Sequence, residues 1–311
     1  MTNRVEPGSS AARKAMVVSL LCGFLMLAGK LTAWLVTGSS AILSDAAESV
    51  IHVIAVAFAA FSLWLSLRPP GKRFLYGFER ITFFSAGFEG LMIMAAALSI
   101  LVVAVRNWIA GIELSHLGGG TALVVAAGIV NAVLGTYLVR TGKRANSLIL
   151  EANGKHVLTD SWTSFGVVGG LLLVIWTGWK PFDPLIAIAV GLNILWSGGR
   201  LIWQAAAGLM DYSDPETARK IREMLDALCS ELGIEYHGVR FRSTGYRLII
   251  EFHLLFPSSV TVGEAHKLAT DVEERLPAVL DMPAEVITHL ESLEDHREVH
   301  HDPHYTGKPE R

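Results

Sequence analysis

Long apolar runs separated by short polar breaks dominate the first two thirds of the sequence. An α-helix needs about 20 apolar residues to cross the hydrocarbon core of a bilayer, and six segments qualify. The pattern therefore predicts an all-α transmembrane domain over residues 15–208, preceded by a cytoplasmic tail over residues 1–14. The predicted spans cover residues 15–37, 41–66, 81–106, 121–140, 154–178 and 184–208.

After residue 208 the sequence becomes more polar and its period changes. Residues 215–232 have helical spacing, with Ile221, Leu225 and Leu228 on one stripe. Three later segments are rich in β-branched, aromatic or aliphatic residues and predict strands, with a second helix between the last two. We expect a soluble domain over residues 212–292 and a flexible tail over residues 293–311. The predicted strands are residues 238–241, 248–256 and 285–291, and the predicted second helix is residues 262–276.

The composition supports a membrane protein and excludes some partners. Of the 311 residues, 51% are hydrophobic and 18% are charged, and the mean hydropathy of +0.43 is too high for an ordinary soluble protein. The net charge of -3 offers no electrostatic footprint for a nucleic acid. Cys22 and Cys229 fall in different parts of the chain, so neither a disulfide framework nor a cysteine zinc site is predicted.

The basic residues predict the orientation in the bilayer. Lys and Arg gather in the N-terminal tail and in the breaks at residues 67–80 and 141–153, and the other breaks carry almost none. Short loops rich in these residues stay cytoplasmic, so both termini are expected in the cytoplasm. The short loops and the lack of a targeting segment favour a bacterial inner membrane.

Two matched pairs of ionisable residues lie inside the predicted spans, where such groups are costly and mark functional sites. Glu48 and His52 are four residues apart in the second span, and His156 and Asp160 repeat that spacing in the fifth. Each pair therefore lies on one helix face. Together they offer two imidazoles and two carboxylates, which suit a tetrahedral Zn²⁺ site, with Fe²⁺, Co²⁺, Ni²⁺ and Mn²⁺ as alternatives.

Other ionisable residues in the spans have more than one interpretation. Asp45 precedes Glu48 by three residues on the same face, so it is an auxiliary ligand or it orients its neighbours. Lys30 in the first span extends to an interface, pairs with a carboxylate or has a functional role. Glu89 in the third span is expected to be that structural partner.

Two segments and several shorter elements resemble the cation diffusion facilitator family of divalent-metal/proton antiporters. The shorter elements are Tyr76-Gly77 with Arg80, Asp183-Pro184, and Leu209-Met210-Asp211. The resemblance implies Zn²⁺/H⁺ antiport by alternating access, a homodimer, and a cytoplasmic α+β domain with ferredoxin-like αββαβ order. The segments are Ser40-Ala-Ile-Leu-Ser-Asp45-Ala-Ala-Glu48-Ser-Val-Ile-His52 and Glu151-Ala-Asn-Gly-Lys-His156-Val-Leu-Thr-Asp160-Ser.

The resemblance also implies further site residues. Arg80 and Asp211 match a structural charge pair of the family, and the stretch from Arg73 to Arg80 lacks the histidine of a second family site, which we therefore expect to be absent. In the second span, Glu48 and His52 occupy positions where the family usually has His or Asp followed by Asp, so metal identity is open. The implied ligands of a cytoplasmic zinc site are His237, His253, His266, His289 and Glu291.

One alternative to transport remains at this point. A metal-sensing or scaffold membrane protein could keep this fold without transporting, and gradient-driven flux separates the two functions. An enzyme is not predicted, because neither a His-Glu-x-x-His motif nor a serine-nucleophile motif is present. The last residues form a tract that captures metal weakly or is simply solvated. Its histidines are His296, His300, His301 and His304.

Overall fold

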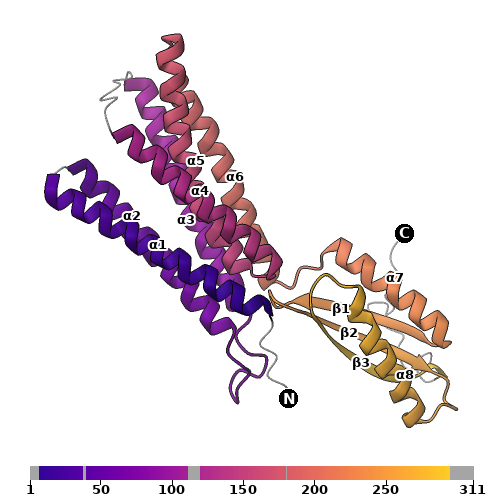
Figure 1. Cartoon of the computed structure of the whole chain (residues 1–311). Coiled ribbons are helices and arrows are strands. Elements are labelled where there is room, and N and C mark those ends of the chain that lie inside the picture. Colours follow the sequence, from indigo (N-terminus) through magenta and orange to yellow (C-terminus); the bar gives the residue numbers. More distant parts are fainter. Residues whose placement is uncertain (1–6, 38–39, 111–119, 180, 295–311) are drawn as a thin grey trace. The chain divides into compact units, whose positions relative to one another are not determined.

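The computed structural model describes residues 7–37, 40–110, 120–179 and 181–294, and Figure 1 shows the whole chain. The chain divides into two compact units, Met1–Ala206 and Ala207–Arg311, and each is considered by itself. The predicted histidine tract after residue 294 lies outside the described residues.

The first unit consists of long helices, as predicted. Helix α1 begins at Pro7, eight residues before the predicted span, so part of the predicted tail is helical. The connections between α1 and α2 and between α3 and α4 lie outside the described residues. The helices are α1 (Pro7–Thr37), α2 (Ser40–Ser66), α3 (Ile81–Ala110), α4 (Gly120–Arg144), α5 (Leu148–Thr177) and α6 (Phe182–Leu209).

The surface of this unit carries many large apolar side chains. Leu35, Trp176 and Trp196 are 73%, 84% and 76% exposed, and similar residues occur along the other helices. Among the described residues, Ser10–Gly29, Ile81–Arg106 and Pro184–Leu209 are helical, long and apolar enough to cross a bilayer. Exposed apolar side chains on such helices fit a hydrocarbon environment. The protein is therefore a membrane protein with apolar helices, and the full set of six spans stays a prediction.

Helix α5 differs from the prediction at its beginning. It starts at Leu148 and α4 ends at Arg144, so most of the polar break predicted over residues 141–153 is helical. Glu151 and Asn153 interrupt the apolar sequence here, so hydropathy placed the beginning of the helix too late. Here Lys155 Nζ lies 2.9 Å from Glu151 Oε1, an i, i+4 ion pair of the kind that helices accommodate. Helix α4 continues to Arg144, where Lys143 and Arg144 suit the negative end of the helix dipole.

Glycines allow α4 and α5 to pack closely. A Cβ atom at Gly154 of α5 would lie 2.7 Å from the backbone nitrogen of Val139 on α4. We expect Gly154→Ala to destabilise the protein by about 1–3 kcal/mol, because the helices must move apart. Thermal unfolding of the purified protein measures this. Gly169→Ala on the same helix is the control, because no atom lies within 4 Å of its added Cβ, and equal stability of the two variants would contradict the prediction.

The second unit has the predicted αββαβ order. Its three-stranded sheet has the order β1-β2-β3, with β1 and β2 antiparallel and β2 and β3 parallel. Strand β1 is longer than predicted, because it continues on both sides of a bulge at Gly238. The elements are α7 (Pro215–Leu232), β1 (Glu235–Ser243), β2 (Leu248–Phe256), α8 (Val262–Arg275), the 3₁₀ turn η1 (Leu276–Val279) and β3 (Ala284–Ser292).

The core of the second unit lies between the sheet and the two helices α7 and α8 (Figure 1). Alternate residues of β2, including Ile250, Phe252 and Leu254, are at most 1% exposed and form the centre of this core. The core also includes the predicted stripe of Ile221, Leu225 and Leu228 from α7. Because successive side chains of a strand point to opposite faces, the other residues of β2 lie on the face away from the helices.

The first turn of α7 is capped by Asp214, whose carboxylate accepts hydrogen bonds from the Thr217 backbone N–H at 2.9 Å and from its hydroxyl at 2.8 Å. The hydrogen bond from the Thr217 backbone lowers the pKa of Asp214 below its ordinary value. We expect Asp214→Ala to destabilise α7 by about 1 kcal/mol at neutral pH. Hydrogen exchange of α7 in the full-length protein measures the effect.

The pH dependence follows from the lowered pKa. A carboxyl group with a depressed folded-state pKa stabilises fully above its unfolded pKa of about 4. That stabilisation disappears as the pH falls through the folded-state pKa, so wild type and variant should converge in acid. Glu223→Ala, which removes an exposed partner of Arg219 on the same helix, is the control and should have a smaller effect. A difference that persists unchanged in acid would contradict the capping role.

Candidate transport site and candidate metal centre

The predicted transport site is built on α5 and α2, which pack against each other. On α5, His156 is 7% exposed and Asp160 is half-buried one turn further along. Asp45, Glu48 and His52 lie on α2, but their side chains are outside what the structure describes. The structure thus brings the two helices together, and convergence of the four side chains on one ion stays a prediction.

A third helix reaches His156. Glu89 of α3 is 0% exposed, and its Oε2 lies 3.5 Å from His156 Nδ1. The sequence predicted Lys30 as the partner of Glu89, but the Lys30 side chain is outside the described residues. No spacing rule could have joined Glu89 to His156, because the two helices are distant in sequence and meet only in the folded bundle.

Helix α5 is also held to α1 by a buried hydrogen bond. Asn153, three residues before His156, donates its Nδ2–H to Ser19 Oγ at 2.9 Å. Both side chains are buried. In a low-dielectric interior such a bond fixes the rotation of the helix strongly. It therefore helps to set the direction in which the face of α5 with His156 and Asp160 points.

Histidines and a carboxylate gather on the open face of the cytoplasmic sheet. The backbone pairs His237 of β1 with His253 of β2, and His253 with His289 of β3. Paired residues of neighbouring strands share a face, and Glu291, two residues after His289, shares it too. The imidazoles stand edge to face, with ring centroids 4.7 Å apart for His237 and His253 and 5.0 Å apart for His253 and His289.

Glu291 lies between two of these imidazoles. Its Oε2 is 3.0 Å from His237 Nε2, and its Oε1 is 2.8 Å from His253 Nδ1. One candidate ligand atom from each of these three residues lies within 4.8 Å of the others. The three residues therefore fit a divalent transition metal such as Zn²⁺, which binds imidazole nitrogen and carboxylate oxygen at about 2.0–2.2 Å.

The protonation states also suit metal binding. Burial lowers the pKa of His253 against the opposing effect of the nearby Glu291 carboxylate. Burial alone would raise the pKa of Glu291, but the hydrogen bond to His237 and the charges of both imidazoles bring it below its ordinary value. A neutral imidazole and an ionised carboxylate are the forms that bind metal, and both are favoured at neutral pH.

The other two residues of the implied cytoplasmic set differ. His289 Nε2 is 3.7 Å from Glu291 Oε1, and the His289 side chain is 67% exposed, so it lies at the edge of the cluster. His266 is exposed on α8, and its backbone carbonyl accepts a hydrogen bond from Thr270. His266 is not one of the three residues whose ligand atoms come together, and its role as a ligand stays a prediction.

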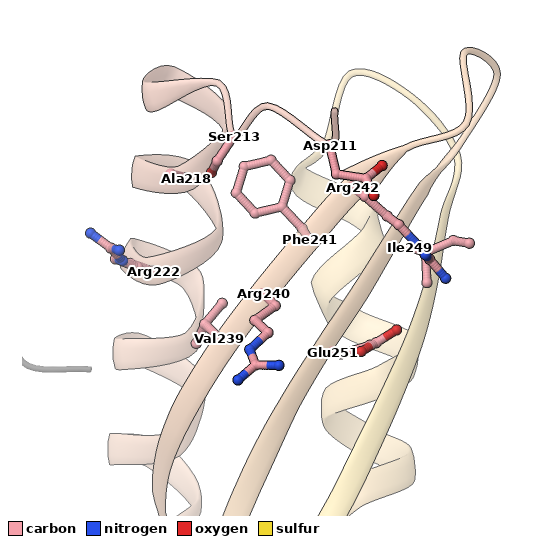
Figure 2. A pocket seen from close by; sticks show the side chains of 10 residues that line it. All are labelled: Asp211, Ser213, Ala218, Arg222, Val239, Arg240, Phe241, Arg242, Ile249 and Glu251. Carbon is pink, nitrogen blue, oxygen red and sulfur yellow. The ribbon is translucent and has the colours of Figure 1, made fainter. Parts of the chain in front are cut away.

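A pocket of about 420 Å³ lies beside β1 in the same domain (Figure 2). Arg240 and Arg242 enter it from β1, Arg222 comes from α7, and Glu251 comes from β2. Asp211, one half of the predicted charge pair, also lines this pocket. Its predicted partner Arg80 belongs to the other compact unit, so the pair stays a prediction.

The family profiles that match this chain divide it close to the boundary between its two compact units. The family profile "Cation efflux transmembrane domain" matches residues 16–210, and "Cation efflux protein, cytoplasmic domain" matches residues 213–293. The "Uncharacterized transporter sll1263" of Synechocystis is 35% identical over 290 residues, which are 93% of each chain. The "Cation-efflux pump FieF" of Salmonella schwarzengrund is 26% identical over 270 residues, or 86% of this chain and 89% of FieF.

Fold and matches together define the class of the protein as a membrane transporter and not an enzyme. The chain belongs to the cation efflux family, the cation diffusion facilitators whose resemblance the motifs predicted. The family transports divalent metal cations, and the fold predicted from the sequence, a helical membrane domain followed by a cytoplasmic α+β domain, is confirmed.

Proposed function

We propose that this protein exports divalent transition-metal ions from the cytoplasm in exchange for protons, with Zn²⁺ as the preferred substrate. The observation that carries the proposal is the position of His156 and Asp160 on one face of α5, largely withdrawn from solvent, where α5 packs against the helix of Glu48 and His52. Titratable groups at such depth need a functional partner. Two imidazoles and two carboxylates match Zn²⁺, with Fe²⁺, Co²⁺, Ni²⁺ and Mn²⁺ as alternatives.

The exchange follows from ligand chemistry. A metal ion binds only neutral imidazole and ionised carboxylate, so an ion that enters from the cytoplasm displaces protons. Protons that enter from the opposite side refill the ligands and release the ion. Alternating access around a site near the bilayer midplane would couple the two movements.

The cytoplasmic domain is proposed to bind Zn²⁺ and to join two copies of the chain. His237, His253 and Glu291 would hold the ion, with His289 beside them, and the ion would tie all three strands of the sheet together. Residues 213–293 match the dimerisation domain of cation efflux proteins, which supports a homodimer. We further propose six spans, both termini in the cytoplasm and a bacterial inner membrane, in agreement with the basic residues of the loops.

Metal uptake into inverted membrane vesicles tests this function. With a pH gradient imposed across the vesicle membrane, the protein should accumulate Zn²⁺, and dissipating the gradient should stop accumulation. A competition series with Fe²⁺, Co²⁺, Ni²⁺ and Mn²⁺ then ranks the substrates. Vesicles that bind metal but show no gradient-driven flux would point to a metal-sensing or scaffold protein instead.

A further inference from the structure

Glu89 of α3 is a buried carboxylate that the proposed four-ligand site does not use. Its side chain is 0% exposed, and neither of its carboxylate oxygens has a hydrogen-bond partner among the described residues. A carboxylate removed from water in this way is costly unless a cation or a hydrogen-bond donor compensates it. A residue that carries such a cost inside a helical bundle is a candidate for function.

The surroundings of Glu89 connect it to the transport site. Its Oε2 lies 3.5 Å from Nδ1 of His156, whose side chain is 9% exposed. Asp160 lies four residues after His156 on α5. A cation bound beside His156 and Asp160 would attract both carboxylates. The position of Glu89 therefore makes sense in a bundle that receives a metal ion.

The ring nitrogen that faces Glu89 indicates how the residue acts. A metal-binding imidazole uses one ring nitrogen for the ion and commonly donates the other N–H to a carboxylate, which fixes the tautomer and the ring orientation. Nδ1 of His156 faces Glu89, so a hydrogen bond between them would make Nε2 the ring nitrogen that binds the ion. Contraction of the 3.5 Å separation by about half an ångström would make a normal hydrogen bond, and such bonds commonly tighten when a ligand binds.

Building on the proposed function, we propose that Glu89 is a positioning residue of the transport site. Its carboxylate accepts the Nδ1–H of His156 and holds Nε2 toward the transported ion. Direct ligation by Glu89 is not needed, because α2 and α5 already supply the four ligands of a tetrahedral site. The site is thus supported by three helices, and α3 takes part through the orientation of His156.

Zn²⁺ binding to the full-length purified protein tests the proposal, with His253→Ala in every variant to remove the cytoplasmic cluster. Glu89→Met keeps the size of the side chain and removes the acceptor, and it should weaken Zn²⁺ binding in the membrane domain about 10–100-fold. Its metal-free thermal stability should not fall, because a costly buried carboxylate is removed. Ser85→Ala, at a buried position one turn earlier on α3, is the matched control and should bind like the parent.

Glu89→Gln is the second variant, because it keeps both the size and an acceptor oxygen. Its loss of affinity should stay below about tenfold, and a loss as large as that of Glu89→Met would overturn the hydrogen-bonding role. X-ray absorption of bound Co²⁺ should show the same number of oxygen ligands in the parent and in Glu89→Met. One oxygen fewer in the variant would overturn positioning in favour of direct ligation.

His156→Ala separates this proposal from the function on which it rests. If His156→Ala loses Zn²⁺ binding while Glu89→Met binds like the parent, the positioning role is wrong and the proposed site remains. If both variants bind like the parent, the proposed site itself is wrong. A Glu89→Met protein that is less stable without metal but binds Zn²⁺ normally would make Glu89 a structural residue.

Discussion

Replacement of His156 by alanine is expected to reduce gradient-driven Zn²⁺ transport at least about a hundredfold, and Asp160→Ala is expected to do the same. Removal of a group that only supports a ligand already costs about 10–100-fold in affinity or activity, so removal of a ligand should cost at least as much. The two residues lie one turn apart on α5, where α5 packs against α2.

Initial rates of Zn²⁺ uptake in inverted vesicles, normalised to the amount of protein, measure this effect. Ser161→Ala is the matched control, because Ser161 is buried beside Asp160 and, among the residues that the structure describes, its hydroxyl donates a hydrogen bond to the carbonyl of Val157 on the same helix, at 3.4 Å. That variant should transport at close to the normal rate. Transport at the native rate by His156→Ala or Asp160→Ala would remove the basis of the proposed site.

Replacement of His253 by alanine is expected to abolish the stabilisation of the cytoplasmic domain by Zn²⁺. An ion that binds only the folded domain stabilises it by about 2.7 kcal/mol at a free concentration a hundred times the dissociation constant. His253 is the central imidazole, paired with His237 on one side and His289 on the other. Its loss would leave Glu291 and His237 as an incomplete ligand set.

Hydrogen exchange of peptides from β1, β2 and β3, with and without Zn²⁺, measures this prediction in the full-length protein. In the wild type, Zn²⁺ should slow the exchange of all three strands, and in His253→Ala it should have little effect. Glu251→Gln is the control, because Glu251 lies on the same face of β2 two residues from His253 and is exposed. Equal protection by Zn²⁺ in His253→Ala and in the wild type would show that the cluster is not a metal site.

Hydrophobic periodicity and segment length predicted α7 and β2 well, because the apolar residues of both elements are buried in the core. The stripe of Ile221, Leu225 and Leu228 identified α7, and the apolar run over residues 248–256 identified β2 with its observed bounds. The beginning of α5 at Leu148 was missed, because Glu151 and Asn153 interrupt the apolar sequence between Leu150 and the predicted span.

The sites were harder to predict, because they depend on pairing between elements. On β1, Gly238 and Val239 oppose a single residue of β2, Phe252, and Gly238 has a φ of 65°. A glycine adopts this left-handed conformation at little cost. Simple alternation would place His237 and Arg240 on opposite faces, whereas the register pairs them with His253 and Glu251, which share one face of β2.

The cytoplasmic cluster therefore came from the family resemblance and not from the spacing of its histidines. The i, i+4 pairs of the proposed transport site, by contrast, lie within single helices, and spacing alone was enough to propose them. Glu89 shows the limit of both approaches. The sequence identified it as a carboxylate inside an apolar span. Its contact with His156 depends on how α3 packs against α5, which no local sequence pattern specifies.

The most direct measurement is the simultaneous flux of metal and protons in vesicles reconstituted with the purified protein. A Zn²⁺ gradient alone should drive protons in the opposite direction, recorded by a pH dye inside the vesicles. Both fluxes should disappear in Asp160→Ala and persist in Ser161→Ala. Zn²⁺ flux without proton movement, or coupled flux that persists in Asp160→Ala, would contradict metal–proton exchange through the site on α2 and α5.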